Sequence, residues 1–374
     1  MLKKTLLLIA CAIMSWSAML ADEVTINGVN FRTYASGTAI VLGIEPGVKN
    51  MEIPNVIALN GKDYTVTDIT SRCCENNTTL ESLTIASSVK YIGSKCFNGC
   101  TNLKKVTIED GVPLLPENCF LNCSSLEEII LPNSITEIGM YAFSKCTSLK
   151  KAVLPKSLKV IDQRVFADCT SLSQLVLPEE LEEIKPDAFN KCAALTKVTF
   201  PTTLRTLGST AFASSGLRTL YLPEGLEKMG DTFNGCKQLR LVSFPTTLDK
   251  IGTFYLCNGI NEIECRRTTP PDLNSGVFMN ELFTKTQVYV PKGSLAAYKY
   301  GAVWSRFTGI IDDYSPFPLT DTNGDKVTDV ADVNRTIDSI LKLNNQTHHR
   351  DDVNRDGIID ITDLNEIINE ILGL

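Results

Sequence analysis

The sequence predicts a β-rich repeat solenoid with one parallel sheet, followed by a small all-α calcium-binding domain. The first observation is a 23-residue pattern that recurs in register, as residues 146–168 and 169–191 show. Repeats of a fixed length of about 20 to 50 residues are typical of stacked architectures. The second observation is a pair of Asp-rich segments near the C-terminal end, whose spacing is typical of calcium loops.

Six segments are expected along the chain. They are a signal peptide at 1–21, an N-terminal β cap at 22–64, a repeat array at 65–287, a C-terminal cap of the array at 288–311, a linker at 312–320 and the calcium-binding domain at 321–374. The net charge of −7 belongs entirely to the last segment, which holds ten Asp and two Glu against two Lys and three Arg. The rest of the chain is balanced, so its charge does not favour binding to nucleic acid.

The first 21 residues have the features of a secretory signal. Lys3 and Lys4 precede an apolar run at 5–14, and Ala21 stands at the expected cleavage point. An alternative is that Leu8 to Cys11 form a lipobox, which would make Cys11 a lipidated N-terminus. No other stretch of the sequence is long and apolar enough to span a bilayer, so we expect a secreted or bacterial cell-surface protein.

Residues 22–70 read as short strands separated by turns. Asn27-Gly28 and Ser36-Gly37 are pairs typical of hairpins and tight turns. The first turn of a stack of repeats must be covered, and we expect this segment to form that cover.

The repeat array contains nine equivalent strand runs. They begin at Leu80, Leu103, Leu126, Leu149, Leu172, Leu195, Leu217, Leu239 and Ile260. In one run Leu126, Ile129 and Leu131 are expected to face inward, and Pro132 ends the strand because it has no N–H group to donate. Nine rungs would pair strand to strand at about 4.8 Å into a parallel sheet.

The fifth residue of each run is expected to point away from the core, toward the open face of the sheet. Near the middle of the array this column is apolar, with Ile130, Val153 and Val176, and Tyr221 follows as a candidate anchor. An exposed apolar stripe with a charged rim predicts a surface that binds a protein or glycan. The alternative is that these residues serve strand propensity alone.

Twelve of the thirteen Cys lie beyond the signal segment, most of them in columns at the repeat spacing. Ser215 replaces Cys at one such position, which favours a role in packing over disulfide formation. His348 and His349 are the only His residues and lie outside the array, so neither zinc binding nor Ser-His or Cys-His catalysis is indicated there. We therefore expect no catalytic residues and no enzyme.

The copies at 146–168 and 169–191 resemble BspA-like, or Treponema-type, leucine-rich repeats. The resemblance covers about residues 65–311, and 288–311 is similar to the segment that commonly closes such arrays. It implies an exported bacterial surface protein that binds or adheres and is not an enzyme.

Two loops near the C-terminal end predict two Ca²⁺ sites, since a hard cation takes six to eight oxygen ligands. The first loop would use Asp321, Asn323, Asp325, Asp329 and Asp332, and the second Asp352, Asn354, Asp356, the carbonyl of Ile358, Asp360 and Asp363. Gly357 allows the sharp turn of the second loop, whereas Lys326 stands at that place in the first. The second site is therefore the more secure expectation.

Two loop-helix units, each with Asp at position 12 of its loop, resemble a type I dockerin over about residues 319–374. The resemblance implies that a cohesin-type module is met through Val330, Ala331, Ile361 and Thr362. One alternative is a small calcium-stabilised domain that docks nothing. Another is that the whole chain is a catalytic or non-catalytic component of a polysaccharide-degrading surface complex.

Overall fold

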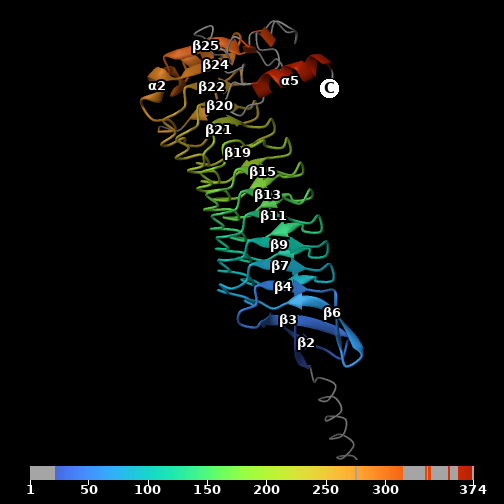
Figure 1. Ribbon diagram of the computed structural model, residues 1–374. Coiled ribbons are helices and arrows are strands. Elements are labelled where there is room, and N and C mark those ends of the chain that lie inside the picture. Colours follow the sequence, from blue (N-terminus) through green and yellow to red (C-terminus); the bar gives the residue numbers. More distant parts are fainter. Residues whose placement is uncertain are drawn as a thin grey trace, which may run out of the picture. The chain divides into compact units, whose positions relative to one another are not determined.

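The computed structural model describes residues 22–273, 276–314, 333–334, 336–337, 353 and 361–372 (Figure 1). The chain divides into two compact units, Met1–Gln174 and Leu175–Leu374, which we call unit 1 and unit 2. The predicted signal peptide lies outside the described residues, as do the linker after residue 314 and most of the segment 321–374.

Unit 1 begins with a mixed sheet. Its strands are β1 (Glu23–Ile26), β2 (Val29–Thr33), β3 (Thr38–Ile44), β5 (Val56–Leu59) and β6 (Lys62–Ile69), in the order β1-β2-β3-β6-β5. Strands β1 and β2 form one antiparallel hairpin, and β5 and β6 form another. The turns are Asn27-Gly28 and Asn60-Gly61, and all four residues have positive φ, as the tight type I′ hairpin turn requires.

The repeats of unit 1 stack into a parallel ladder. Its strands are β4 (Asn50–Ile53), β7 (Ser82–Ile85), β9 (Lys105–Ile108), β11 (Glu128–Ile130) and β13 (Lys151–Val153), which follow one another in Figure 1. Ser82 pairs with Lys105, so one turn of the chain matches the 23-residue period. A second line of short strands comprises β8 (Tyr91–Ile92), β10 (Leu114–Leu115), β12 (Glu137–Ile138) and β14 (Val160–Ile161).

Unit 2 continues the same pattern of short strands. They are β15 (Gln174–Val176), β16 (Glu183–Ile184), β17 (Thr206–Leu207), β18 (Thr219–Tyr221), β19 (Lys228–Met229), β20 (Leu241–Phe244), β21 (Lys250–Ile251), β22 (Glu262–Cys265), β23 (Asp272–Leu273), β24 (Gln287–Pro291) and β25 (Gly309–Tyr314). One parallel sheet has the order β18-β20-β22-β24-β25. The short helices α2 (Leu282–Lys285) and α3 (Leu295–Lys299), with the 3-10 turn η1 (Trp304–Arg306), lie between strands at its end, and α5 (Ile361–Leu372) follows near the C-terminus.

The solenoid has about 12 turns, not the nine expected. Strand β4 pairs with β7 ahead of the first predicted run, and β24 and β25 extend the sheet after the last. These three turns were missed because they lack the Cys column, and because Phe278, which precedes β24, does not keep the earlier spacing of the Phe residues. The run at 195–200 is a further correction, because it forms no strand. Leu195 and Phe200 are buried there, and Arg218 N donates to Thr196 O at 3.1 Å, so the chain keeps the path of the repeat without the strand pairing.

A column of stacked Phe rings runs through the core of each unit. In unit 1 Phe97, Phe120, Phe143 and Phe166 stack at centroid distances of 5.3, 5.4 and 5.4 Å. In unit 2 the column runs through Phe189, Phe212, Phe233, Phe254 and Phe278 at 5.0, 5.7, 5.8 and 5.6 Å. Phe278 was not foreseen, because it follows Phe254 at 24 residues and breaks the spacing of the column.

Candidate binding face of the sheet

The outward positions of the unit 1 ladder form a straight column. Thr84 pairs with Thr107, and Ile130 pairs with Val153 in the next rung. Alternation along each strand puts Ile129 and Ala152 in the core and leaves their neighbours outside. Ile130 is 54% exposed and Val153 is half-buried. The two side chains therefore form a small apolar patch, which we call the apolar step, on the solvent side of the sheet.

Ion pairs between successive rungs border this apolar step. Lys151 Nζ lies 2.7 Å from Glu128 Oε1, and Lys150 Nζ lies 3.2 Å from Glu127 Oε2. Each partner is well exposed, so these pairs contribute little to stability. Their effect on the surface is to neutralise the charges beside Ile130 and Val153, which leaves an apolar patch with a polar but nearly uncharged rim.

A third ion-pair centre lies nearer the start of the ladder. Glu81 meets Lys49 at 3.0 Å and Lys104 at 3.4 Å. Hydrogen bonds from these two amines, that from Lys49 first, lower the pKa of the Glu81 carboxyl. The charged side chains at the rim of the face thus form ion pairs along several rungs of unit 1.

Unit 2 has two further predicted partner-binding residues. Val176, in β15, is 66% exposed. Tyr221, in β18, is half-buried. It pairs with Ser243 of β20, which in turn pairs with Glu264 of β22. Ser243 is only 1% exposed and Glu264 only 5%. The expectation that the fifth-residue column stays open is therefore wrong at β20 and β22, whereas Tyr221 in β18 stays partly exposed, as Val153 does.

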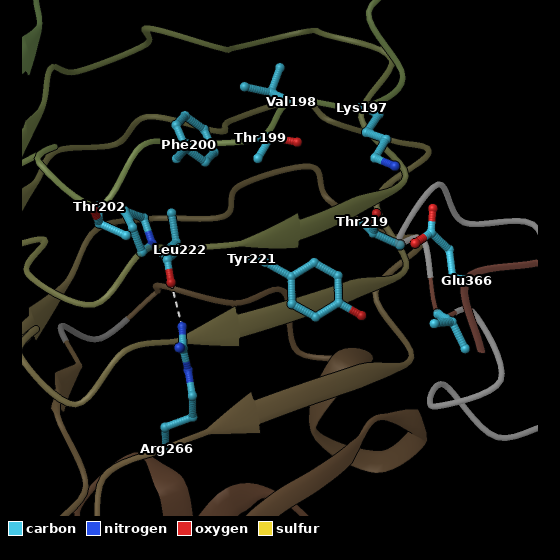
Figure 2. A pocket seen from close by; sticks show the side chains of 12 residues that line it. Lys197, Val198, Thr199, Phe200, Thr202, Thr219, Tyr221, Leu222, Arg266 and Glu366 are labelled. Carbon is cyan, nitrogen blue, oxygen red and sulfur yellow. Dashed lines mark hydrogen bonds between the residues drawn. The ribbon is translucent and has the colours of Figure 1, made fainter. Parts of the chain in front are cut away.

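Tyr221 lines a pocket of about 470 Å³ instead of standing free on the surface (Figure 2). The array contributes Lys197, Thr199, Tyr221 and Arg266 to its wall, together with six neighbouring residues, and the C-terminal segment contributes Val353 and Glu366. The wall of this pocket thus includes residues from a segment far along the chain. A repeat pattern carries no information about such a contact.

Arg266 was not singled out from the sequence. Its Nη1 lies 2.8 Å from Glu224 Oε1, its Nε donates to Phe244 O at 3.2 Å, and its Nη2 donates to Leu222 O. All three nitrogens of the guanidinium are thus committed to the ends of neighbouring turns. Arg266 holds those turns together and does not offer a receptor for an anion.

The predicted calcium ligands fall almost entirely outside the described residues. These are Asp321, Asn323, Asp325, Asp329, Asp332, Asp352, Asn354, Asp356, Ile358 and Asp360, together with the predicted contact residues Val330 and Ala331. The exception is Asp363, which is fully buried in the first turn of α5. Ile361 and Thr362, the other predicted contact residues, are exposed.

The part of the chain that the structure describes contains neither a cluster of metal-ligating side chains nor a membrane-spanning helix. No three His, Cys, Asp or Glu side chains there are grouped so that they could hold a metal ion. No helix among those residues has the length and apolar character needed to cross a membrane.

The geometry defines a class: a β-solenoid of leucine-rich turns that presents a regular outer sheet. The model of the BspA type leucine-rich repeat region matches residues 67–192 and 160–285, which together span more than half of the chain. The chain therefore belongs to the BspA-type leucine-rich repeat family. Proteins of this kind are typically non-enzymatic binding proteins.

Solved structures are similar to this chain, and the first of them supports the fold. A leucine-rich repeat protein from Bacteroides ovatus is 21% identical with a TM-score of 0.53, and the match covers 79% of this chain and 83% of that one. A leucine-rich cell surface protein from Faecalibacterium prausnitzii is 22% identical with a TM-score of 0.43, covering 65% and 94%. No curated protein matches the chain.

Proposed function

We propose that this protein is an exported, non-enzymatic binding and adhesion protein whose outer sheet recognises a protein or glycan partner. The observation that carries the proposal is the apolar step of Ile130 and Val153, exposed on a rigid ladder and bordered by paired charges. Soluble proteins rarely keep such patches without a use, and solenoids bind on extended regular surfaces. Membership of a family of repeat proteins with binding roles supports the same conclusion.

The proposal is tested by measuring binding of the full chain to a panel of extracellular matrix proteins and glycans immobilised on a sensor. We expect saturable binding to at least one member. The same preparation is incubated with polysaccharides and the release of reducing ends is followed. Hydrolysis with no binding partner would favour the alternative, an enzyme of a polysaccharide-degrading complex.

We further propose that the C-terminal segment binds Ca²⁺ and docks a cohesin-type module. The support is the sequence spacing of the two loops, the buried carboxylate of Asp363 and the exposed positions of Ile361 and Thr362. When bound, Ca²⁺ would neutralise part of a segment with a net charge of −7 and join the two ends of each loop.

Calorimetric titration of the full chain with Ca²⁺ tests this second proposal. Asp363→Ala should weaken binding more than Asp332→Ala, because the second loop has the Gly that its turn requires. Removal of Ca²⁺ by a chelator should also lower the helical signal in circular dichroism. A chain that takes up no Ca²⁺ would contradict the proposal, and binding that ignores both substitutions would place the ions elsewhere.

A further inference from the structure

The outer face of unit 2 is buried where the repeat itself leaves it open. Thr219, Leu241, Ser243 and Glu264 occupy outward positions of β18, β20 and β22, yet each is at most 7% exposed. The inward neighbours Val242 and Ile263 are buried as well. A single parallel sheet packs only one of its faces on the core of the solenoid. Burial of the other face therefore requires a second layer.

The described residues identify where that layer comes from. Val353 and Glu366 line the same pocket as Lys197 and Tyr221, and Val353 is itself buried. Glu366 belongs to α5, and Figure 2 shows its side chain among those that surround the pocket. The pocket thus marks one edge of a contact between the array and the segment that follows it.

The chemistry of the two sides is complementary at this edge. On the array side of the pocket, Lys197 provides an amine. On the side of the C-terminal segment, Glu366 provides a carboxylate. Helix α5 contains three acidic residues and no Lys or Arg in its sequence. The apolar side chains Leu241 and Val353, both buried, supply the area that must leave water for the contact to be stable.

Chain connectivity favours an occupant from the same molecule. The sheet that contains β18, β20 and β22 ends at β25, whose last residue is Tyr314, only two strands beyond β22. At about 4.8 Å per strand this is about 10 Å. The C-terminal segment is thus tethered beside the face, and tethering raises its effective concentration there to the millimolar range or above, as is typical of short linkers.

We propose that the outer face of β18, β20 and β22 is the docking surface for the chain's own C-terminal segment, with Lys197 set against Glu366. This goes beyond the proposed partner-binding role, because it assigns an occupant to a different stretch of the array. It also explains why Tyr221, which the sequence favours as an anchor, is half-buried. An external partner that needs this face has to displace the segment first.

Zero-length carbodiimide cross-linking of the full chain tests the docking. The reagent joins an amine and a carboxylate only where they touch, and mass spectrometry of the digested monomer band locates each bond. We expect a bond between Lys197 and Glu366. Glu128 and Lys151, 2.7 Å apart in unit 1, provide the reference bond in every sample. Lys197→Arg, which keeps the charge but removes the reactive amine, and Glu366→Gln should each abolish the first bond and leave the reference bond intact.

A third variant tests the surface without touching either cross-linked residue. Leu241→Arg places a charged side chain in the buried face and should lower the yield of the Lys197–Glu366 bond at least tenfold, with the reference bond unchanged. A reference bond without any Lys197–Glu366 bond in the wild-type chain overturns the proposal. So does a Lys197–Glu366 bond found only in the dimer band, which would make the occupant a second copy. Binding at Ile130 and Val153 is measured separately, so its failure is distinguishable from either result.

Discussion

The Cys146 thiol is buried and donates a hydrogen bond to Phe120 O at 3.3 Å. Cys123 and Cys169 make the same bond to Phe97 and Phe143, both at 3.2 Å. The sequence predicts a small packing residue at these positions, and the structure adds that each thiol donates a second hydrogen bond to a carbonyl of the preceding turn, which also accepts from a backbone N–H. Ala could fill the space but could not donate, which explains why Cys recurs in this column.

Cys146→Ala should lower the free energy of unfolding by about 0.5–1.5 kcal/mol, since it removes one of two hydrogen bonds to Phe120 O, which still accepts from Cys123 N at 3.2 Å. Cys146→Ser should cost less, because Ser215 already occupies the equivalent place in another repeat. Urea unfolding of the two variants measures the difference. If Ala proves as stable as the wild type, the thiol hydrogen bond is without consequence.

Burial raises the pKa of the Cys100 and Cys146 thiols to about 12 from an ordinary value of 9.0. The folded chain therefore keeps these protons while the unfolded chain begins to lose them above pH 9. The stabilisation from the raised pKa is complete below pH 9 and is lost as pH rises toward 12. We expect the urea midpoint to fall between pH 8 and 10.5, and to fall less steeply in Cys146→Ser. Equal slopes in the two proteins would show that this thiol does not contribute.

Among the secondary-structure elements, the seven successive repeat turns from Arg72 to Ser214 each contain two residues in the left-handed region. Tyr141 has φ 59° and Lys145 has φ 62°, and the next repeat places Arg164 and Asp168 at 56° and 62°. Gly99 holds the place of Lys145 in an earlier copy, with φ 75°. Residues with a Cβ pay for this conformation, by roughly 1–2 kcal/mol each, and Asn tolerates it better.

Lys145→Asn should therefore stabilise the chain, by about 0.5–1 kcal/mol, a part of the left-handed penalty. Lys156→Asn is the matched control, because Lys156 is also exposed but does not have a positive φ. Thermal unfolding of both variants provides the comparison. A gain of the same size in the control would trace the effect to the loss of charge, and no gain at Lys145 would show that the turn is not strained.

How far the sequence predicts this fold depends on the kind of contact. The Leu and Phe columns and the hairpin turns follow from local spacing, so the repeat architecture and the first sheet were foreseen. Strands β4, β24 and β25 were not, because they keep the pairing of the ladder without the Cys column of the other turns. The burial of Ser243 and Glu264 could not be inferred either, since the repeat pattern carries no information about what covers the outer face of the sheet.

At the scale of the whole molecule, the outer sheet has two different characters. In unit 1 it leaves Ile130 exposed beside paired charges, and in unit 2 it buries Ser243 and Glu264. The first is suited to an external partner and the second to an internal one. We therefore propose that unit 1 binds the external partner and that the Tyr221 region binds the chain's own C-terminal segment.

We propose that a partner binds the outer sheet of unit 1 at Ile130 and Val153. The most direct measurement is the affinity of the double variant Ile130→Ser, Val153→Ser for the partner found in the binding panel, with unfolding curves to confirm that the fold is kept. The matched control is Val56→Ser, Tyr91→Ser, which removes two exposed apolar side chains from strands β5 and β8 of the same unit. We expect binding at least about tenfold weaker in the first variant, a loss of about 1.4 kcal/mol, and unchanged binding in the control. Wild-type affinity in the first variant would contradict it.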